Sequence, residues 1–107
     1  MGKIEKIEKL AQKGKASKLV SFTRDKDKSV RLAAIAGLSK VVENEDALNT
    51  LVGLMEDEDQ DIRKAVVTAL GESKGSYVET KLSYCLSHEK DPQVLEAARE
   101  ALKKVRK

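Results

Sequence analysis

The chain has 107 residues, a net charge of +3, and 40% hydrophobic and 36% charged residues. This length fits one domain with a modest core, and the high charge favours amphipathic helices with solvated outer faces. No apolar run could span a bilayer or act as a signal peptide, so the sequence favours a cytoplasmic, bacterial-type protein. A single cysteine excludes an internal disulfide and a thiolate metal cluster.

Positive and negative charges are unevenly spread along the chain. Residues 1–18 carry a net charge of +4 and residues 103–107 another +4, whereas residues 43–61 contain eight acidic residues and no basic one. A groove that binds nucleic acid requires continuous positive charge, which an acidic middle segment would interrupt. This distribution makes nucleic acid a disfavoured partner.

The N-terminal segment, about residues 3–13, predicts a helix. Its apolar residues share one helical face: Ile4, Ile7, Leu10 and Ala11. The segment does not match the repeated phrases that follow it. We therefore interpret it as a cap over the first of the repeated units.

Three phrases of the sequence recur at a constant spacing. DKSVRLAAIAGLS begins at Asp27, DQDIRKAVVTALG at Asp59 and DPQVLEAAREALK at Asp91, each 32 residues after the one before. Apolar residues coincide at positions i, i+3, i+4, i+7 and i+8, one face of an α-helix. The coinciding sets are Val30, Ile62 and Val94; Ala33, Ala65 and Ala97; Ala34, Val66 and Ala98; Gly37, Ala69 and Ala101; and Leu38, Leu70 and Leu102. Small side chains on this face predict a helix packed closely between neighbours.

A second apolar stripe precedes each phrase and predicts a first helix in every unit. In the third unit this stripe is shifted by one residue. The polar turns between the helices end in Asp27, Asp59 and Asp91, which suit the N-cap position, and Pro92 suits the first helical turn. The predicted units cover about residues 15–42, 46–72 and 77–105.

Helix pairs of this kind bury both of their apolar faces only when they stack side by side. The predicted fold is all-α: one domain over residues 1–107, an α-α superhelix (α-solenoid) of three helix pairs plus an N-terminal capping helix. We expect the stack to be right-handed.

The middle unit, LVGLMEDEDQDIRKAVVTALG, resembles the short HEAT-like repeats of the phycobilisome-lyase type. The matching features are Asp-x-Asp in the turn, a branched residue followed by Arg, and an Ala-rich helix ending in Leu-Gly. The resemblance implies that the turn Asp and the helix Arg form a ladder between successive repeats. In this chain the ladder residues would be Asp25, Arg31, Asp57 and Arg63. The ladder should stop in the third unit, where Leu95 replaces the Arg and Glu89 the first Asp.

Candidate residues for catalysis or metal binding are few. His88 is the only histidine and lacks further nitrogen or sulfur partners for a metal, so we interpret it as an exposed turn residue. Cys85 lies on an apolar stripe and is expected to be a buried small hydrophobe rather than a nucleophile. The acidic run at residues 56–61 lacks the glycine and distal glutamate of a calcium loop. We predict no catalytic, cofactor or metal site and no enzymatic activity.

The outward face of the second helices is the best candidate for a binding surface. Helical geometry assigns to it Leu32, Ile35, Ala36 and Ser39, then Lys64, Val67, Thr68 and Gly71, then Glu96, Arg99, Glu100 and Lys103. Exposed apolar side chains in a groove mark contact sites. The leading hypothesis is a non-catalytic protein-binding or scaffolding module that contacts a protein segment through Leu32, Ile35, Lys64, Val67 and Arg99.

Two other functions remain open from the sequence. One is nucleic-acid binding through the basic ends, which would show a steep loss of affinity with salt. The other follows from the family resemblance and is an accessory role beside a tetrapyrrole-attaching lyase. The sequence does not define the oligomeric state.

Overall fold

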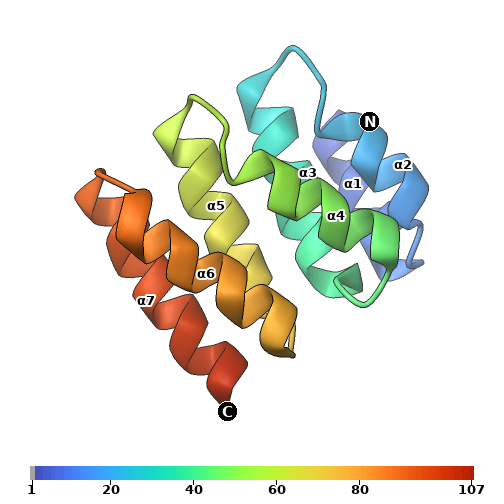
Figure 1. The fold of residues 1–107 in the computed structure, drawn as a ribbon. Helices are drawn as coiled ribbons and strands as arrows, with labels where there is room; N and C mark the ends of the chain where they lie inside the picture. Colours follow the sequence, from blue (N-terminus) through green and yellow to red (C-terminus); the bar gives the residue numbers. More distant parts are fainter. Residues whose placement is uncertain (1) are drawn as a thin grey trace.

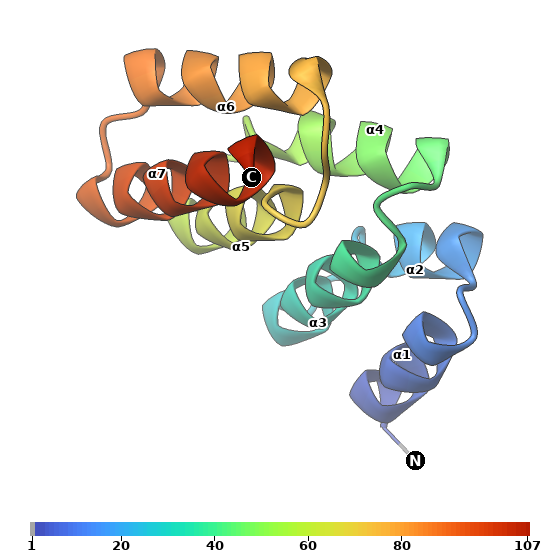
Figure 2. The same ribbon diagram turned by 90° about the horizontal axis from the view of Figure 1, so that it is seen from below.

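The computed structural model describes residues 2–107, and within that range it is all-helical, with no β-strand. The helices are α1 (Lys3–Gln12), α2 (Ala16–Phe22), α3 (Lys28–Leu38), the 3-10 helix η1 (Ser39–Val41), α4 (Glu45–Leu54), α5 (Gln60–Leu70), α6 (Ser76–His88) and α7 (Pro92–Arg106). Helices α2, α4 and α6 form a first layer, and α3, α5 and α7 a second layer packed against it (Figures 1 and 2). The predicted all-α solenoid is confirmed.

An aspartate begins each second-layer helix. The side chains of Asp27, Asp59 and Asp91 accept hydrogen bonds from the backbone N–H groups of Ser29, Asp61 and Gln93, at 2.8–2.9 Å. These carboxylates satisfy donors that a helix N-terminus cannot pair internally, and they oppose the positive end of its dipole. The same cap therefore fixes where each unit turns from its first helix to its second.

The repeated small and branched residues form the middle of the core. Ala34, Val66 and Ala98 are completely buried, and the Leu that closes each stripe is nearly so. The three alanines one position earlier, Ala33, Ala65 and Ala97, are only half-buried, although they pack against the core. The second-layer helices are thus sandwiched as predicted, with this alanine row along the margin of the buried stripe.

The first layer changes register at its third helix, as the sequence predicted. Leu51 and Leu82 are both fully buried, yet they lie 31 rather than 32 residues apart. α2 packs against α4, whereas contacts between α4 and α6 are few. The second layer is more continuous, because α3 packs on α5 and α5 on α7. The units are therefore held together mainly through their second-layer helices.

Helix α1 extends the second layer. It packs mainly against α3 and also contacts α2 and η1, burying Ile7, Leu10 and Ala11 (Figure 2). Gly37 on α3 lies at this junction: a Cβ there would be only 3.0 Å from a methyl group of Leu19 on α2, whereas the nearest α1 atoms, in Ala11 and Ile7, would be in ordinary contact at 3.5 and 3.6 Å. α1 therefore occupies the place of a second helix preceding the first unit.

Candidate functional site

A shallow groove runs between α3 and α5 on the outer side of the second layer. Its volume is about 500 Å³, and its lining residues are Leu32, Ala36, Ser39, Asp61, Lys64, Ala65, Thr68, Ala69 and Glu72. The groove forms because alanines occupy three of its lining positions, with Ala36 and Ala65 at the surface and Ala69 at the floor. A small side chain there leaves room for a larger apolar group from a partner.

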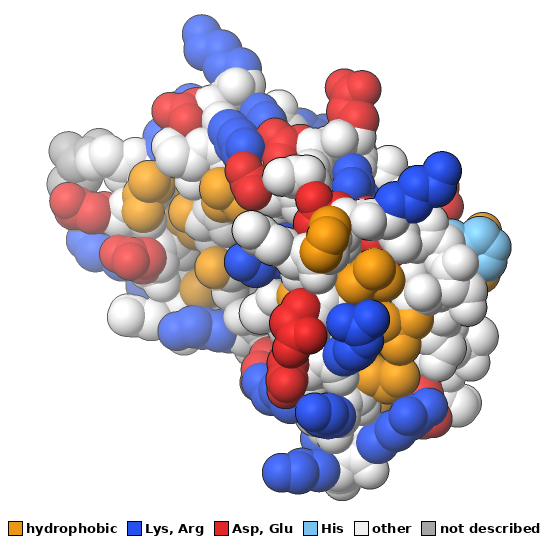
Figure 3. Space-filling view, turned by 90° about the vertical axis from the view of Figure 1, so that its left-hand side faces the viewer, with side chains coloured by type: hydrophobic (Ala, Val, Ile, Leu, Met, Phe, Trp, Pro, Cys, Tyr) orange, Lys and Arg blue, Asp and Glu red, His pale blue; other side chains and the backbone are white. Residues whose placement is uncertain are grey.

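A second groove, of about 430 Å³, lies between α1 and α3 and shares Ala36 with the first. Ile4, which is 42% exposed, and Ala33 contribute its apolar lining. Together the two grooves form a band across three helices, which we call the second-layer strip: Ile4, Leu32, Ala33, Ala36, Ala65 and Ala69. Apolar side chains at the molecular surface gather in patches between charged ones, as Figure 3 shows for one face.

The structure places only part of the predicted binding set on this surface. Leu32 and Lys64 line the groove, as expected. Ile35 and Val67 are each only 1% exposed, so the prediction that they face a partner is wrong. Arg99 is exposed on α7, where it forms an ion pair with Glu96 at 3.5 Å, away from the residues that line the groove.

The burial of Ile35 and Val67 follows from how the layers pack. A helix such as α3 contacts α1, α2, α4 and α5, so its buried arc is wider than the five-residue stripe visible in the sequence. Arg99 occupies the equivalent repeat position in α7, where no helix of residues 2–107 covers it. Ile35 and Val67 therefore belong to the interior, whereas Arg99 lies at the surface of the described residues.

Sequence reasoning missed Ile4, Ala69 and Glu72 as lining residues of the two grooves. Ile4 was assigned to the buried face of the cap. Ala69 was assigned to the core stripe, and it is indeed only 3% exposed at the groove floor. The sequence signal that indicates this groove is the spacing of Leu32, Ala36 and Ser39. These residues lie along one narrow ridge of the helix, and Ile35 lies outside that ridge.

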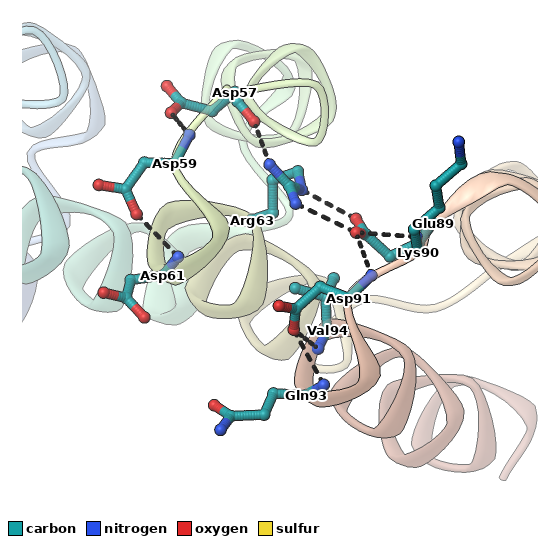
Figure 4. A network of polar contacts seen from close by, with 9 residues as sticks. All are labelled: Asp57, Asp59, Asp61, Arg63, Glu89, Lys90, Asp91, Gln93 and Val94. Atoms are coloured by element: carbon teal, nitrogen blue, oxygen red, sulfur yellow. Dashed lines mark hydrogen bonds and ion pairs between the residues drawn. The ribbon is translucent and has the colours of Figure 1, made fainter.

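The turns between first and second helices carry a polar network at one edge of the stack (Figure 4). The guanidinium of Arg63 donates to both carboxylate oxygens of Glu89, at 2.8 and 3.1 Å, and to the backbone carbonyl of Asp57 at 2.8 Å. Glu89 also accepts from the backbone N–H of Asp91 at 3.0 Å. This network joins the turn of the second unit to that of the third.

A corrected ladder emerges from these contacts. Asp25 and Asp57 each brace their own turn by accepting from the backbone N–H two residues on, at 2.9 and 2.8 Å. Arg31 donates to the carbonyls of Asp25 and Lys26 in its own turn, so the expectation that it reaches the neighbouring turn is wrong.

Lysines replace Arg31 as the links between the early units. Lys28 bridges to Asp59 at 3.0 Å and to Asp61 at 2.7 Å, and Lys3 bridges to Asp25 at 2.7 Å. Glu89 serves as the third-unit counterpart of Asp25 and Asp57, so the replacement of Asp by Glu does not interrupt the network there. Its longer side chain reaches Arg63 as well as its own turn.

These contacts shift the titration of the carboxylates that make them. The Arg63 guanidinium lowers the pKa of Glu89 from its ordinary value of 4.5, against an opposing effect of burial. Lys28 lowers the pKa of Asp59, and Lys3 lowers that of Asp25. The hydroxyl and backbone N–H of Ser29 lower the pKa of Asp27.

Lowered carboxylate pKa values predict an acid-sensitive stack. Each group binds protons more weakly in the folded than in the unfolded chain, so its stabilisation is complete above the unfolded pKa and is lost as pH falls through the folded pKa. We expect Tm to fall steadily from about pH 5 to about pH 2. Circular dichroism melts across that range measure it, and Glu89→Gln should flatten the dependence. A Tm independent of pH below 5 would contradict this assignment.

Cys85 and His88 do not form a reactive pair. Cys85 is 9% exposed, and burial raises the pKa of its thiol, which confirms its prediction as a buried hydrophobe. His88 is exposed; its ring stacks on Tyr84 at 3.8 Å, and its Nδ1 lies 2.9 Å from the Tyr84 carbonyl oxygen. Among residues 2–107, no group of three or more His, Cys, Asp or Glu side chains could hold a metal ion.

Comparison with known proteins identifies the repeat. The family model described as HEAT repeats matches residues 16–103, most of the chain. No curated protein matches the chain significantly. The phycobilisome-lyase-like subtype stays a prediction. In the described part of the chain, no helix combines the length and apolarity needed to cross a membrane.

Proposed function

This chain belongs to the HEAT-repeat family, whose members are generally protein-interaction and scaffold modules, and from that premise we propose that it is a non-catalytic module that binds a protein segment along the second-layer strip. The segment would lie across α1, α3 and α5. We further propose that Leu32 and Lys64 contact it directly.

The observation that carries this proposal is the continuity of the two grooves through Ala36. A partner that lays one or two bulky apolar side chains into alanine-lined depressions buries area without requiring the helices to move. Burial of that kind is worth about 25 cal/mol per Å² of apolar surface before the losses of association are counted. Leu32 supplies the largest apolar side chain of the groove between α3 and α5.

Charged residues at the rim of that groove would orient the bound segment. Asp61 and Glu72 pair with Lys28 and Lys104, whereas Lys64 forms no ion pair within residues 2–107. An unpaired ammonium beside an apolar floor favours a segment with a carboxylate next to its apolar residues.

Leu32→Glu is expected to weaken partner binding. A carboxylate in the groove places an unpaired charge against the apolar part of the partner. The measurement is affinity capture from the native cell extract, followed by titration of the recovered partner against wild-type and variant protein. We expect at least a tenfold loss of affinity, about 1.4 kcal/mol.

Asn49→Glu is the matched control, because Asn49 is exposed on α4 in the other layer. It adds the same charge and should leave binding unchanged. Equal affinity for both variants and wild type would show that the second-layer strip is not the binding surface.

A further inference from the structure

Helix α6 presents an exposed aromatic face on the first layer. Tyr77 is 50% and Tyr84 56% exposed, and with Ile4 they are the large hydrophobic residues that residues 2–107 leave exposed. The two tyrosines are seven residues apart, so they project from the same side of the helix, two turns from each other. Tyrosine is enriched at protein interfaces because it buries a large ring while its hydroxyl stays satisfied.

A groove of about 720 Å³ lies beside this face, between α4 and α6, where the first layer separates. Val52 of α4, Met55 directly after that helix and Cys85 of α6 provide its apolar lining, and Tyr84 lies along its side. The Tyr84 ring is held in place by its stack on His88. The groove is therefore a preformed receptor for one bulky side chain.

Opposite charges flank the same groove. Lys81 contributes an ammonium group whose Nζ lies 5.6 Å from the centre of its own Tyr77 ring, and Glu56 contributes a carboxylate from the end of α4. Neither forms an ion pair within residues 2–107. A patch that holds one unpaired acid, one unpaired base, a protruding aromatic ring and a receiving groove is complementary to itself.

We propose that this patch is the interface of a homodimer, in which the α6 helices of two copies pack antiparallel about a two-fold axis near Lys81. Two-fold dimers are the commonest closed assemblies, and they require each patch to match itself. Tyr77 lies four residues before Lys81 and Cys85 four residues after it, about 6 Å on either side at 1.5 Å per residue. Tyr77 of each copy then enters the groove between Cys85 and Met55 of the other.

The same geometry pairs the free charges. The Lys81 ammonium group lies over the Tyr77 ring, on the side away from the two-fold axis. When that ring enters the groove of the second copy, the ammonium group is therefore placed near Glu56 of the second copy. Each dimer gains two such pairs, related by symmetry. The interface lies on the first layer and leaves the second-layer strip open for its own partner.

A charge-reversal mixture tests the arrangement. The oligomeric state is measured by analytical ultracentrifugation from about 10 µM to about 1 mM protein. Wild type should shift from monomer to dimer, and Tyr77→Ala should raise the dissociation constant at least tenfold. Glu56→Lys and Lys81→Glu should each remain monomeric, because each substitution puts like charges at both symmetry-related contacts between positions 56 and 81.

An equimolar mixture of Glu56→Lys and Lys81→Glu should recover the dimer, since both symmetry-related pairs are then opposite in charge. All these side chains are on the surface, so circular dichroism should show unchanged helix content. Wild type that stays monomeric at about 1 mM, or a mixture that stays monomeric when wild type dimerises, overturns the proposal. If wild type stays monomeric, the α6 face instead contacts a different protein or only solvent.

Discussion

Ala34→Leu is expected to destabilise the protein by about 2–3 kcal/mol. Ala34 is completely buried on α3, between helices of its own layer and the first layer. Three added carbons cannot fit without moving a neighbouring helix, because protein interiors are packed as densely as organic crystals. For a chain of this length, Tm should fall by roughly 10–20 °C, as measured by circular dichroism or calorimetry.

Ala36→Leu supplies the matched control, since Ala36 is exposed two residues along the same helix. Its added carbons project into the groove between α3 and α5, so its effect should stay within about 0.5 kcal/mol. Equal effects at the two positions would show that α3 is not sandwiched, and the two-layer packing described above would then be incorrect.

Arg63→Ala is expected to destabilise the chain by about 2–3 kcal/mol. The substitution removes the two-point contact with Glu89 and the bond to the Asp57 carbonyl. It also leaves the Glu89 carboxylate, 9% exposed, without its cation. Urea denaturation at neutral pH provides the free energy of unfolding.

Two further variants separate charge from geometry in this network. Arg63→Lys keeps the positive charge but lacks the planar fork, so it should fall between wild type and alanine. Arg99→Ala removes an exposed arginine that pairs with Glu96 on its own helix, and its effect should stay below about 0.5 kcal/mol. If Arg63→Ala is as mild as Arg99→Ala, the turn network does not hold the second and third units together.

The sequence predicted the repeat architecture well because its signals are local and periodic. The N-cap aspartates, the small-residue stripe and the one-residue shift before α6 each depend on residues within a single helix or turn. A spacing of 32 residues then aligns those local features in successive units. The position of α1 in the second layer was less accessible, since its apolar face matches no repeat phrase and only contact with α3 places it.

The binding surface was harder to predict because it depends on what covers each helix. Ile35 and Val67 lie outside the apolar stripe in a helical projection, yet neighbouring helices bury them. Their counterpart Arg99 is exposed on α7, the final helix that the structure describes. The predicted partners of the ladder arginines were incomplete for a related reason. Arg31 and Arg63 have equivalent positions in their repeats, but only Arg63 faces a glutamate in the next turn, and the longer glutamate side chain reaches its guanidinium group.

Site-specific photo-cross-linking can show whether partners bind through the second layer. A photoreactive phenylalanine analogue is placed at Ala36 in one preparation and at Asn49, on the opposite layer, in another. After irradiation in native extract, we expect a saturable cross-linked species from position 36 that disappears with Leu32→Glu, and none from position 49. A cross-link from position 49 with none from position 36 would contradict it.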